Sequence, residues 1–416
     1  MRRIPCILLV CFLFVPTIAA EEPILTVEAG AYDRIQTIIQ APLDFSKLYP
    51  GKDPNKIAIN LYDGETVVPA QWIAPVFGET EGKLIFVLGK AIPAGHSRTY
   101  KLLTSDRAGA IPCYDLERVE GDHVTVIYKP SKPGLEAGPR KILQYNDGIQ
   151  KYEPDPDSHL SRSGYVHPLW TPAGRIVTGD RCPDHPHQRG CFFAWTKCTF
   201  KGKEVNFWAL DTGKSRTVSP PKFTNGPVMA VLQAENELLA RDESALRETL
   251  TYSIYGGIAD GWIIDVFMEN QVVNEPLQIE QYSYGGMAYR GPASWLNQEL
   301  DIVTSEGIMG RGSDLTRAKW IQMNGPAEND PQSARGVVYF DLPSNPRYPT
   351  FLRVHPTKPY FAFAYHQREG LFIDQGHPVR LGYRILVHDG LPEKKRLEAM
   401  SADLEYPPTV RVSTVK

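Results

Sequence analysis

The feature that most constrains the fold is an alternation of apolar and polar side chains from Leu246 to Tyr255. Apolar residues hold most even positions of this segment, and polar residues hold most odd ones. Successive side chains of a β-strand point to opposite faces, so a period of two predicts a strand that is buried on one side. Residues 262–268, 336–340 and 383–387 are further apolar runs of strand length. These runs predict an all-β fold, with a large antiparallel sandwich of two sheets.

Only the end of the chain carries a helical pattern. Pro392 is a good first-turn residue, Leu397, Met400 and Leu404 would share one helical face, and Pro407 would stop the run. We therefore expect one short C-terminal helix.

The composition supports a packed protein with many turns. The 416 residues include 34 glycines and 35 prolines, while 42% are hydrophobic and 10% aromatic. This combination argues against both disorder and a helical bundle. The formal net charge is −3, so there is no chain-wide positive field to bind nucleic acid, and we expect no nucleic-acid partner.

The start of the chain, residues 1–20, differs from the rest. Arg2 and Arg3 form a basic start, a nearly continuous apolar run follows, and Thr17 to Ala20 offer small residues for cleavage. This is the pattern of a secretory signal peptide. The run is too short for a permanent anchor, and no later segment reaches spanning length. We expect a mature protein without a membrane span that is secreted or periplasmic.

The remaining chain divides into two β-rich parts. In residues 21–110, Asp63-Gly64 supplies a turn between two extended runs, and residues 84–88 have the pattern of a strand that is buried on both faces. We expect a small N-terminal β-sandwich module there. The longer part, residues 111–416, would form the large sandwich.

Removal of the signal peptide would leave the cysteines at positions 113, 182, 191 and 198. In an oxidising compartment four cysteines can form two disulfides in any of three pairings. A Cys182–Cys191 disulfide would close a loop around the most histidine-rich stretch of the chain and make it rigid. The alternative, that some or all of the four are buried free thiols, is open.

The densest group of reactive side chains lies between Tyr165 and Trp208. In an extended backbone His185 and His187 would project to the same side. Pro186 between them restricts the segment to a sheet edge or a loop, which a ligand can reach.

Three interpretations of this stretch are open. In the first, one histidine is a general acid or base, since imidazole titrates near neutral pH, and Asp184 with Arg189 binds sugar or carboxylate oxygens. In the second, His185 and His187, together with His167, bind a divalent metal such as zinc, iron or copper. In the third, these polar side chains stabilise a loop by hydrogen bonds.

Glu280 and Arg290 extend the candidate site. A carboxylate at Glu280 that faced the histidines would complete an acid/base pair for epimerisation, hydrolysis or elimination. A structural ion pair between Glu280 and Arg290 is the alternative. Aromatic side chains can stack on the C–H faces of sugar rings, with core packing as the alternative for each. The aromatic candidates are Trp170, Trp195, Trp208 and Tyr289.

Paired motifs resemble those of a known family. Residues 167–174 (HPLWTPAG) and 183–190 (PDHPHQRG) are similar to motifs of a family of exported bacterial proteins that are labelled PmoA or "methane oxygenase". The similarity covers most of residues 120–400. Where the family has a third histidine, this chain has Gln188. Later segments that resemble motifs of the family are residues 285–290, 345–349 and 382–390.

The label itself implies no activity for this chain. Methane oxygenase subunits of that name are membrane-embedded helical proteins, whereas this chain has no spanning segment after its signal peptide. What the resemblance implies is a galactose-mutarotase-like β-supersandwich, in a family of unknown function whose exported members are associated with glycan use.

From the residues and the resemblance together we expect an exported, carbohydrate-active protein. It would be an enzyme that cleaves or rearranges a sugar, as a hydrolase, lyase or epimerase, by histidine-mediated acid/base chemistry. A non-catalytic glycan-binding protein and a metal-dependent oxidoreductase are the alternatives. We expect His167, His185, His187 and Glu280 to be catalytic, Asp184, Arg189, Trp195, Tyr289 and Arg290 to bind substrate, and His185 and His187 to hold a divalent metal if one binds.

Overall fold

The computed structural model describes residues 22–53, 57–74, 81–105, 112–129, 138–155, 158–258, 261–327 and 330–415. The predicted signal peptide lies outside these residues. Helix is limited to α1 (Phe45–Leu48), α2 (Lys394–Glu405) and two 3₁₀ turns within the described ranges, η1 (Ala293–Trp295) and η2 (Gly310–Ser313). The predicted all-β fold and the short C-terminal helix are both confirmed.

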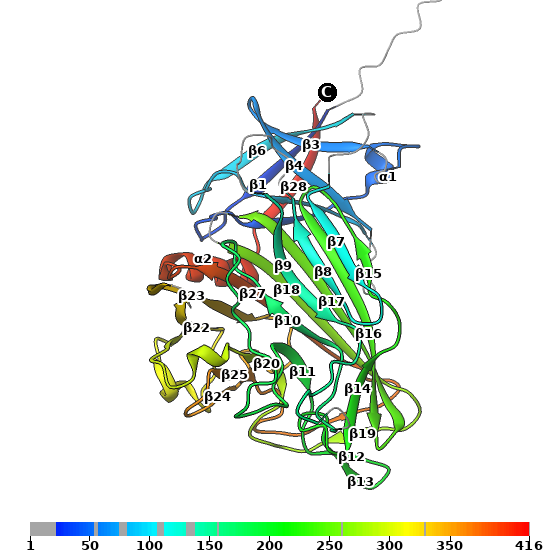
Figure 1. Cartoon of the computed structure of the whole chain (residues 1–416). Helices are drawn as coiled ribbons and strands as arrows, with labels where there is room; N and C mark the ends of the chain where they lie inside the picture. The colour runs from blue at the N-terminus through cyan, green and yellow to red at the C-terminus, as the bar shows by residue number, and fades with distance from the viewer. Residues whose placement is uncertain are drawn as a thin grey trace, which may run out of the picture.

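Two large antiparallel sheets, which contain long strands in the centre of Figure 1, form the body of the molecule. The eight-stranded sheet has the order β24 (Leu352–Val354), β25 (Tyr360–Phe363), β20 (Gly286–Arg290), β11 (Cys191–Ala194), β10 (Tyr165–Leu169), β9 (Arg140–Asn146), β8 (His123–Tyr128) and β7 (Tyr114–Val119). The nine-stranded sheet has the order β14 (Gly213–Thr217), β16 (Met229–Ala240), β17 (Glu243–Ile258), β18 (Gly261–Val272), β27 (Val379–Asp389), β23 (Asp330–Asp341), β22 (Trp320–Ala327) and β21 (Asp301–Thr304), with β15 (Lys222–Thr224) paired to β16.

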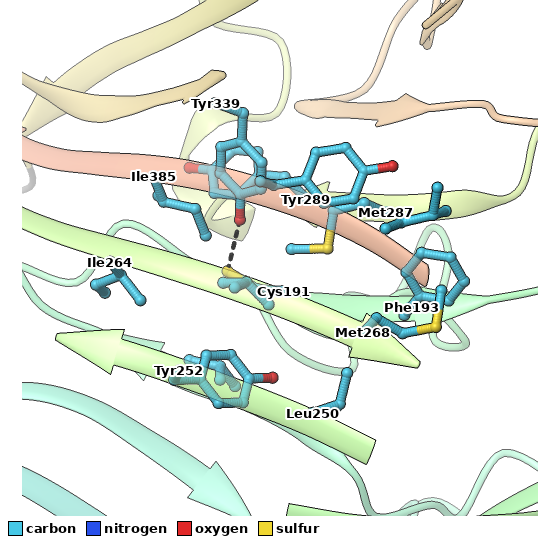
Figure 2. Close-up of a cluster of buried hydrophobic side chains, with 14 of the residues drawn as sticks. Cys191, Phe193, Leu250, Tyr252, Ile264, Met268, Met287, Tyr289, Tyr339 and Ile385 are labelled. Atoms are coloured by element: carbon cyan, nitrogen blue, oxygen red, sulfur yellow. Dashed lines mark hydrogen bonds between the residues drawn. The ribbon is translucent and has the colours of Figure 1, made fainter. Parts of the chain in front are cut away.

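The main hydrophobic core contains one face of each large sheet. From β17 it takes Leu246, Leu250, Tyr252 and Ile254, as the period of two predicts. Figure 2 shows side chains of β17 and β18 with those of β11 and β20 in this core. Glu248 is the exception in the alternation, since it is buried, and its carboxylate accepts hydrogen bonds from the amides of Asn236 and Asn270. Those bonds offset the cost of burying a polar group.

A seven-stranded sheet with its own buried cluster occupies the top of Figure 1. Its order is β2 (Ile38–Pro42), β5 (Lys83–Val87), β4 (Thr66–Ile73), β3 (Ala58–Asp63), β6 (Ser97–Ser105), β1 (Glu22–Glu28) and β28 (Thr409–Val415). Strand β28 pairs with β1 along seven positions, so the last strand of the chain completes the N-terminal sheet. The division of the chain near residue 110 stays a prediction.

Helix α2 and a buried ion pair join the two ends of the chain. Arg34 contacts Asp403 of α2 at 2.8 Å, and both side chains are at most 5% exposed. Leu397 and Met400 of α2 lie in one buried cluster with Ile85 of β5. The helix therefore packs between the N-terminal sheet and the nine-stranded sheet. No helix in the described ranges is long and apolar enough to cross a membrane.

A smaller four-stranded sheet lies at the opposite end of the molecule from the N-terminal sheet, at the bottom of Figure 1. Its order is β13 (Lys203–Val205), β12 (Cys198–Phe200), β19 (Leu277–Ile279) and β26 (Leu371–Ile373).

Candidate functional site

The histidine-rich motif forms the loop between β10 and β11. Two consecutive turns shape it, because the amide of His185 donates to the carbonyl of Cys182 and the amide of Gln188 donates to the carbonyl of His185, each at 3.0 Å. The backbone is therefore not extended. The prediction that an extended segment brings the two histidines to the same side is wrong. The rings of His185 and His187 nevertheless lie close, with centroids 5.6 Å apart.

The loop lies on the outer face of the eight-stranded sheet, away from the main core. Along β11, Phe193 faces the main core, whereas Phe192 belongs to a separate buried cluster on the opposite face. Along β20, Ala288 also belongs to that outer cluster, so the two-residue period places Arg290 on the same face.

Asp184 is the centre of the hydrogen-bond network in the loop. Its two carboxylate oxygens accept hydrogen bonds from Nη1 and Nη2 of Arg290 at 3.0 and 2.7 Å. Oδ2 also lies 3.1 Å from Nδ1 of His185. Arg290 donates in addition to Oε1 of Gln188 at 3.1 Å. Gln188 therefore has a role here as a neutral acceptor for the arginine.

The ionisation of Asp184 follows from these contacts. Burial opposes the charged form, but the hydrogen bonds and the positive charge of Arg290 outweigh it, so the pKa of Asp184 lies below its usual value. The Arg290 side chain is fully buried, whereas that of His185 is 29% exposed. A charged carboxylate thus holds one side of the His185 ring, while part of the ring remains accessible to a ligand.

A third histidine, His355, joins this loop from the chain segment after β24. Its ring centroid lies 5.1 Å from that of His185, with the two planes at 74°. Its Nδ1 accepts hydrogen bonds from the amides of Thr357 and Lys358, so its proton is on Nε2 when the ring is neutral. We define His185, His187 and His355 as the histidine cluster.

His187 and His355 of the histidine cluster are neutral at physiological pH. Burial, followed by the proximity of His185, lowers the pKa of His187 to about 4 and that of His355 to about 4. Nearby cations act in the same direction: Arg162 and Arg290 on His187, and Arg353, Arg311 and Lys358 on His355.

Positive charge surrounds the histidine cluster. The ammonium of Lys358 lies 4.0 Å from Oδ2 of Asp184. Arg311 donates to the carbonyls of His355 and Lys358, so it holds the segment that carries both side chains. Asp184 is the carboxylate that contacts His185, and it is shared with Arg290 and Lys358. The site therefore suits a ligand or transition state that develops negative charge.

Three buried polar atoms around this site have no protein partner among the described residues. They are Nε of Arg290, the hydroxyl of Tyr360 and Nη1 of Arg162. The ring of Tyr360 lies 6.3 Å from that of His355, and Arg162 acts on the pKa of His187. Buried polar groups are normally hydrogen-bonded, so each of these atoms could bind a polar group of a ligand or a water molecule.

Two predicted site residues lie next to the loop without joining the cluster contacts. His167 is on β10, where Nδ1 forms a 2.9 Å hydrogen bond with the hydroxyl of Thr178. Arg189 is fully buried, and it contacts Asp180 and the Tyr165 hydroxyl, each at 3.3 Å. Arg290, rather than Arg189, is thus the partner of Asp184, and Arg189 holds the base of the loop.

Trp195 and Tyr289, the two of the four aromatic candidates that were expected to bind substrate, are core residues. Trp195 is fully buried and donates from Nε1 to Oδ1 of Asn270 at 2.6 Å. Tyr289 is also fully buried, packs near Cys191 in the main core (Figure 2), and donates to the carbonyl of Val177. Neither ring has an exposed face, so the packing alternative holds for both.

Glu280 immediately follows β19 of the four-stranded sheet. Its amide donates to the carbonyl of Lys197, and its charge, after burial, helps to raise the pKa of the Cys198 thiol. Arg290 pairs with Asp184 instead. The alternative prediction, a structural ion pair between Glu280 and Arg290, is therefore wrong. Among the described residues, no contact joins Glu280 to the histidine cluster.

The predicted Cys182–Cys191 disulfide is absent. The four cysteines among the described residues are all buried free thiols. Cys191 faces the main core and contacts the hydroxyl of Tyr339 at 3.0 Å, as Figure 2 shows. Cys182 lies instead in the loop, close to Arg290 and Gly179. The two sulfur atoms are thus held in different environments, which is the physical reason that they do not pair.

A metal centre would need at least three suitable ligands at one point. No group of three or more His, Cys, Asp or Glu side chains within the described ranges is arranged to hold a metal ion. His185 and His187 are neighbours, but the third ring, His355, uses Nδ1 as an acceptor for two amides.

His355, Lys358 and Arg162 were missed by the sequence interpretation. His355 and Lys358 stand in a proline-flanked loop with no motif of their own. They reach the site because β25 pairs with β20, the strand that ends in Arg290. Their proximity is a property of the sheet order, which a single sequence does not display.

Comparison with known proteins gives a family and distant similarities to solved structures. A family model with the description "Family of unknown function (DUF6807)" matches residues 134–402. No curated protein matches the sequence. An alpha-mannosidase from Enterococcus faecalis V583 is similar over 96% of this chain and 46% of its own, with 9% identity and a TM-score of 0.40. A candidate kojibiose phosphorylase from the human microbiome is similar over 71% of this chain and 37% of its own, with 10% identity and a TM-score of 0.28. The chain thus spans less than half of the length of either protein, and scores this low carry no functional argument.

Proposed function

The chain belongs to DUF6807, a family of unknown function, and we propose that it is an exported, carbohydrate-active enzyme in which His185 transfers a proton. The reaction is the rearrangement or elimination of a sugar, as in an epimerase or a lyase. The resemblance to PmoA-labelled proteins and the export from the cell are part of this proposal.

The observation that carries the proposal is the Asp184–His185 contact. A carboxylate on Nδ1 fixes the orientation and tautomer of an imidazole and leaves Nε2 to exchange a proton with a substrate. Asp184 is itself fixed by two hydrogen bonds from the fully buried Arg290. The partial exposure of His185 gives a substrate access to the ring.

The other two histidines are suited to bind substrate hydroxyls. A neutral imidazole can donate one hydrogen bond and accept another, which matches a sugar hydroxyl. With pKa values of about 4, His187 and His355 are neutral across the physiological range. The ring of Tyr360, whose buried hydroxyl has no partner among the described residues, lies 6.3 Å from that of His355.

The arrangement favours proton transfer over hydrolysis. Glycoside hydrolases usually place two carboxyl groups on either side of the bond that breaks. Here Asp184 is occupied by Arg290 and His185, and Glu280 follows β19 of the four-stranded sheet. The cations around the cluster instead suit an oxyanion or enolate, the species formed when a base removes a proton next to a carbonyl or carboxylate.

The test is a screen of neutral sugars and uronic acids in deuterated water, followed by proton NMR. The wild-type protein should exchange a C–H proton, interconvert epimers or form an unsaturated product with at least one of them. His185→Ala should lower that rate by about 10²–10⁴-fold, the usual contribution of a general acid or base. His377→Ala is the matched control, because this histidine is 83% exposed and pairs with Asp374 outside the site. Equal rates for wild type and His185→Ala would refute the assignment.

A further inference from the structure

A cavity lies on a different sheet from the histidine cluster. It has a volume of about 1080 Å³ and is bounded by β4 and β5 of the N-terminal sheet and by the outer face of β16, β17 and β18. We call it the inter-sheet groove. It is distinct from the site at Asp184, which lies on the eight-stranded sheet.

The groove exists because the N-terminal sheet packs on one part of the nine-stranded sheet and leaves the rest of that face open. Ile85 lies in a buried cluster with Met229 and Tyr255 at the junction. Oε1 of Gln71 accepts hydrogen bonds from the amides of Val228 and Met229 at 3.2 and 3.0 Å. These contacts fix one wall of the groove against its floor.

The floor carries neutral polar groups in a regular row. Gln233 of β16 pairs in register with Thr251 of β17, and Thr251 pairs with Phe267 of β18. Ser253 lies two residues further along the same face of β17. Amides and hydroxyls of this kind donate and accept hydrogen bonds without carrying a charge.

Aromatic rings accompany these polar groups. Phe267 on the floor is 38% exposed, although it is a large apolar side chain in the middle of a sheet. Trp72 of β4 lies in the opposite wall. Ring faces of this kind pack against the C–H faces of a sugar, while neighbouring amides and hydroxyls bind its hydroxyl groups.

The charged groups that line the groove are already engaged within the protein. Asp265 forms a two-point ion pair with the buried Arg384 at 2.6 and 2.8 Å. Glu269 pairs with Arg380. Lys222 pairs with Glu235 at 3.3 Å and Lys83 donates to Gln40. Because these charges are engaged within the protein, they offer a charged ligand little net attraction, which favours a neutral ligand.

From this lining we propose that the inter-sheet groove binds a segment of a neutral glycan chain. The volume exceeds the roughly 300–1,000 Å³ typical of small-molecule pockets, so it accommodates several sugar units. A peptide that adds to a sheet needs a free edge, but the floor here is a sheet face. The site is independent of the reaction proposed for His185, because it lies on the other large sheet.

The test is calorimetric titration of the full chain with soluble neutral polysaccharides, namely a mixed-linkage glucan, a galactomannan and an arabinoxylan. Phe267→Ala should weaken binding by about fivefold through loss of the ring face. Ser253→Ala, which removes a hydroxyl from the floor of the groove, should weaken it by a similar factor. Phe372→Ala is the control, since Phe372 is 53% exposed on β26 and lies outside the groove.

The variants separate the two proposals. Binding that is weakened by Phe267→Ala and Ser253→Ala but unchanged by His185→Ala supports the groove, whatever the enzymatic result. Binding that only His185→Ala abolishes would place the glycan at the histidine cluster and overturn the groove proposal. Failure to bind any of the three polysaccharides, or binding of an unstructured peptide that the same groove variants abolish, would also overturn it.

Discussion

Asp184 and Arg290, which are 106 residues apart in the sequence, form a two-point ion pair that joins the histidine-rich loop to the end of β20. The arginine side chain is fully buried and the carboxylate is 13% exposed. An ion pair of this kind adds little net stability when it is intact, but its loss leaves an uncompensated buried charge.

We therefore expect Asp184→Ala to lower the free energy of unfolding by about 3 kcal/mol. Urea denaturation followed by circular dichroism measures it. Glu398→Ala is the control, since Glu398 forms an exposed i,i+4 pair with Lys394 on α2, and it should change stability by no more than about 0.5 kcal/mol. If the two variants are equally stable, the ion pair does not hold the loop.

The free thiols give a second prediction. If the protein is denatured without reductant and treated with iodoacetamide, the cysteines at 113, 182, 191 and 198 should all be alkylated, because they are unpaired. Peptide mass spectrometry reads each site separately. A linked peptide that contains Cys182 and Cys191 would contradict the structure and restore the disulfide expected from the sequence.

Buried histidines predict a loss of stability in acid. His366 and His388 are at most 1% exposed, and burial is the main cause that lowers the pKa of each to about 4. The unfolded chain takes up these protons near pH 6.5, whereas the folded chain takes them up only near pH 4. Their contribution to stability is therefore present above pH 6.5 and is lost as the pH falls towards 4.

The measurement is urea denaturation at several pH values between 7.5 and 4.5. Between pH 6.5 and 4 each of these histidines should contribute a slope of up to about 1.4 kcal/mol per pH unit. His388→Gln should remove the contribution of one histidine from the slope of unfolding free energy against pH. This change in slope does not depend on how the substitution affects stability at pH 7.5. An unchanged slope would mean that His388 is protonated in the folded protein.

The sequence was sufficient for the features that depend on local pattern. The alternation from Leu246 to Tyr255 predicted both the strand and its buried face, because side-chain direction in a strand depends only on position. The pattern also left Glu248 on the core side, and the structure keeps it there with two amide partners. His185 and His187 do lie together, but two consecutive turns bring them close and not the extended backbone that was expected.

The features that depend on sheet order could not be predicted. His355 reaches His185 through the pairing of β25 with β20, which joins distant segments of the chain. The choice of Arg290 over Arg189 as the partner of Asp184 has the same origin. Conversely, Trp195 and Tyr289 are aromatic residues of the kind that can stack on sugars, but they face the core. The two-residue period of β11 and β20 directs them inward.

The start of β20 supplies the last prediction. Gly286 has a φ of +91°, and a Cβ at this position would lie 2.3 Å from the carbonyl oxygen of Phe363 on β25. Gly202 also has a positive φ, +70°, but a Cβ there would meet no atom within 4 Å. Gly286→Ala therefore combines backbone strain with a backbone clash, whereas Gly202→Ala carries the strain alone.

We expect Gly202→Ala to cost about 1 kcal/mol of unfolding free energy and Gly286→Ala at least about 3 kcal/mol. Because β20 ends in Arg290, a shift of this strand should also loosen the hold of Arg290 on Asp184. Gly286→Ala should therefore reduce the activity that depends on His185 more than Gly202→Ala does. Thermal unfolding and the NMR assay measure the two effects, and equal losses in both variants would show that the β20–β25 contact does not position the site.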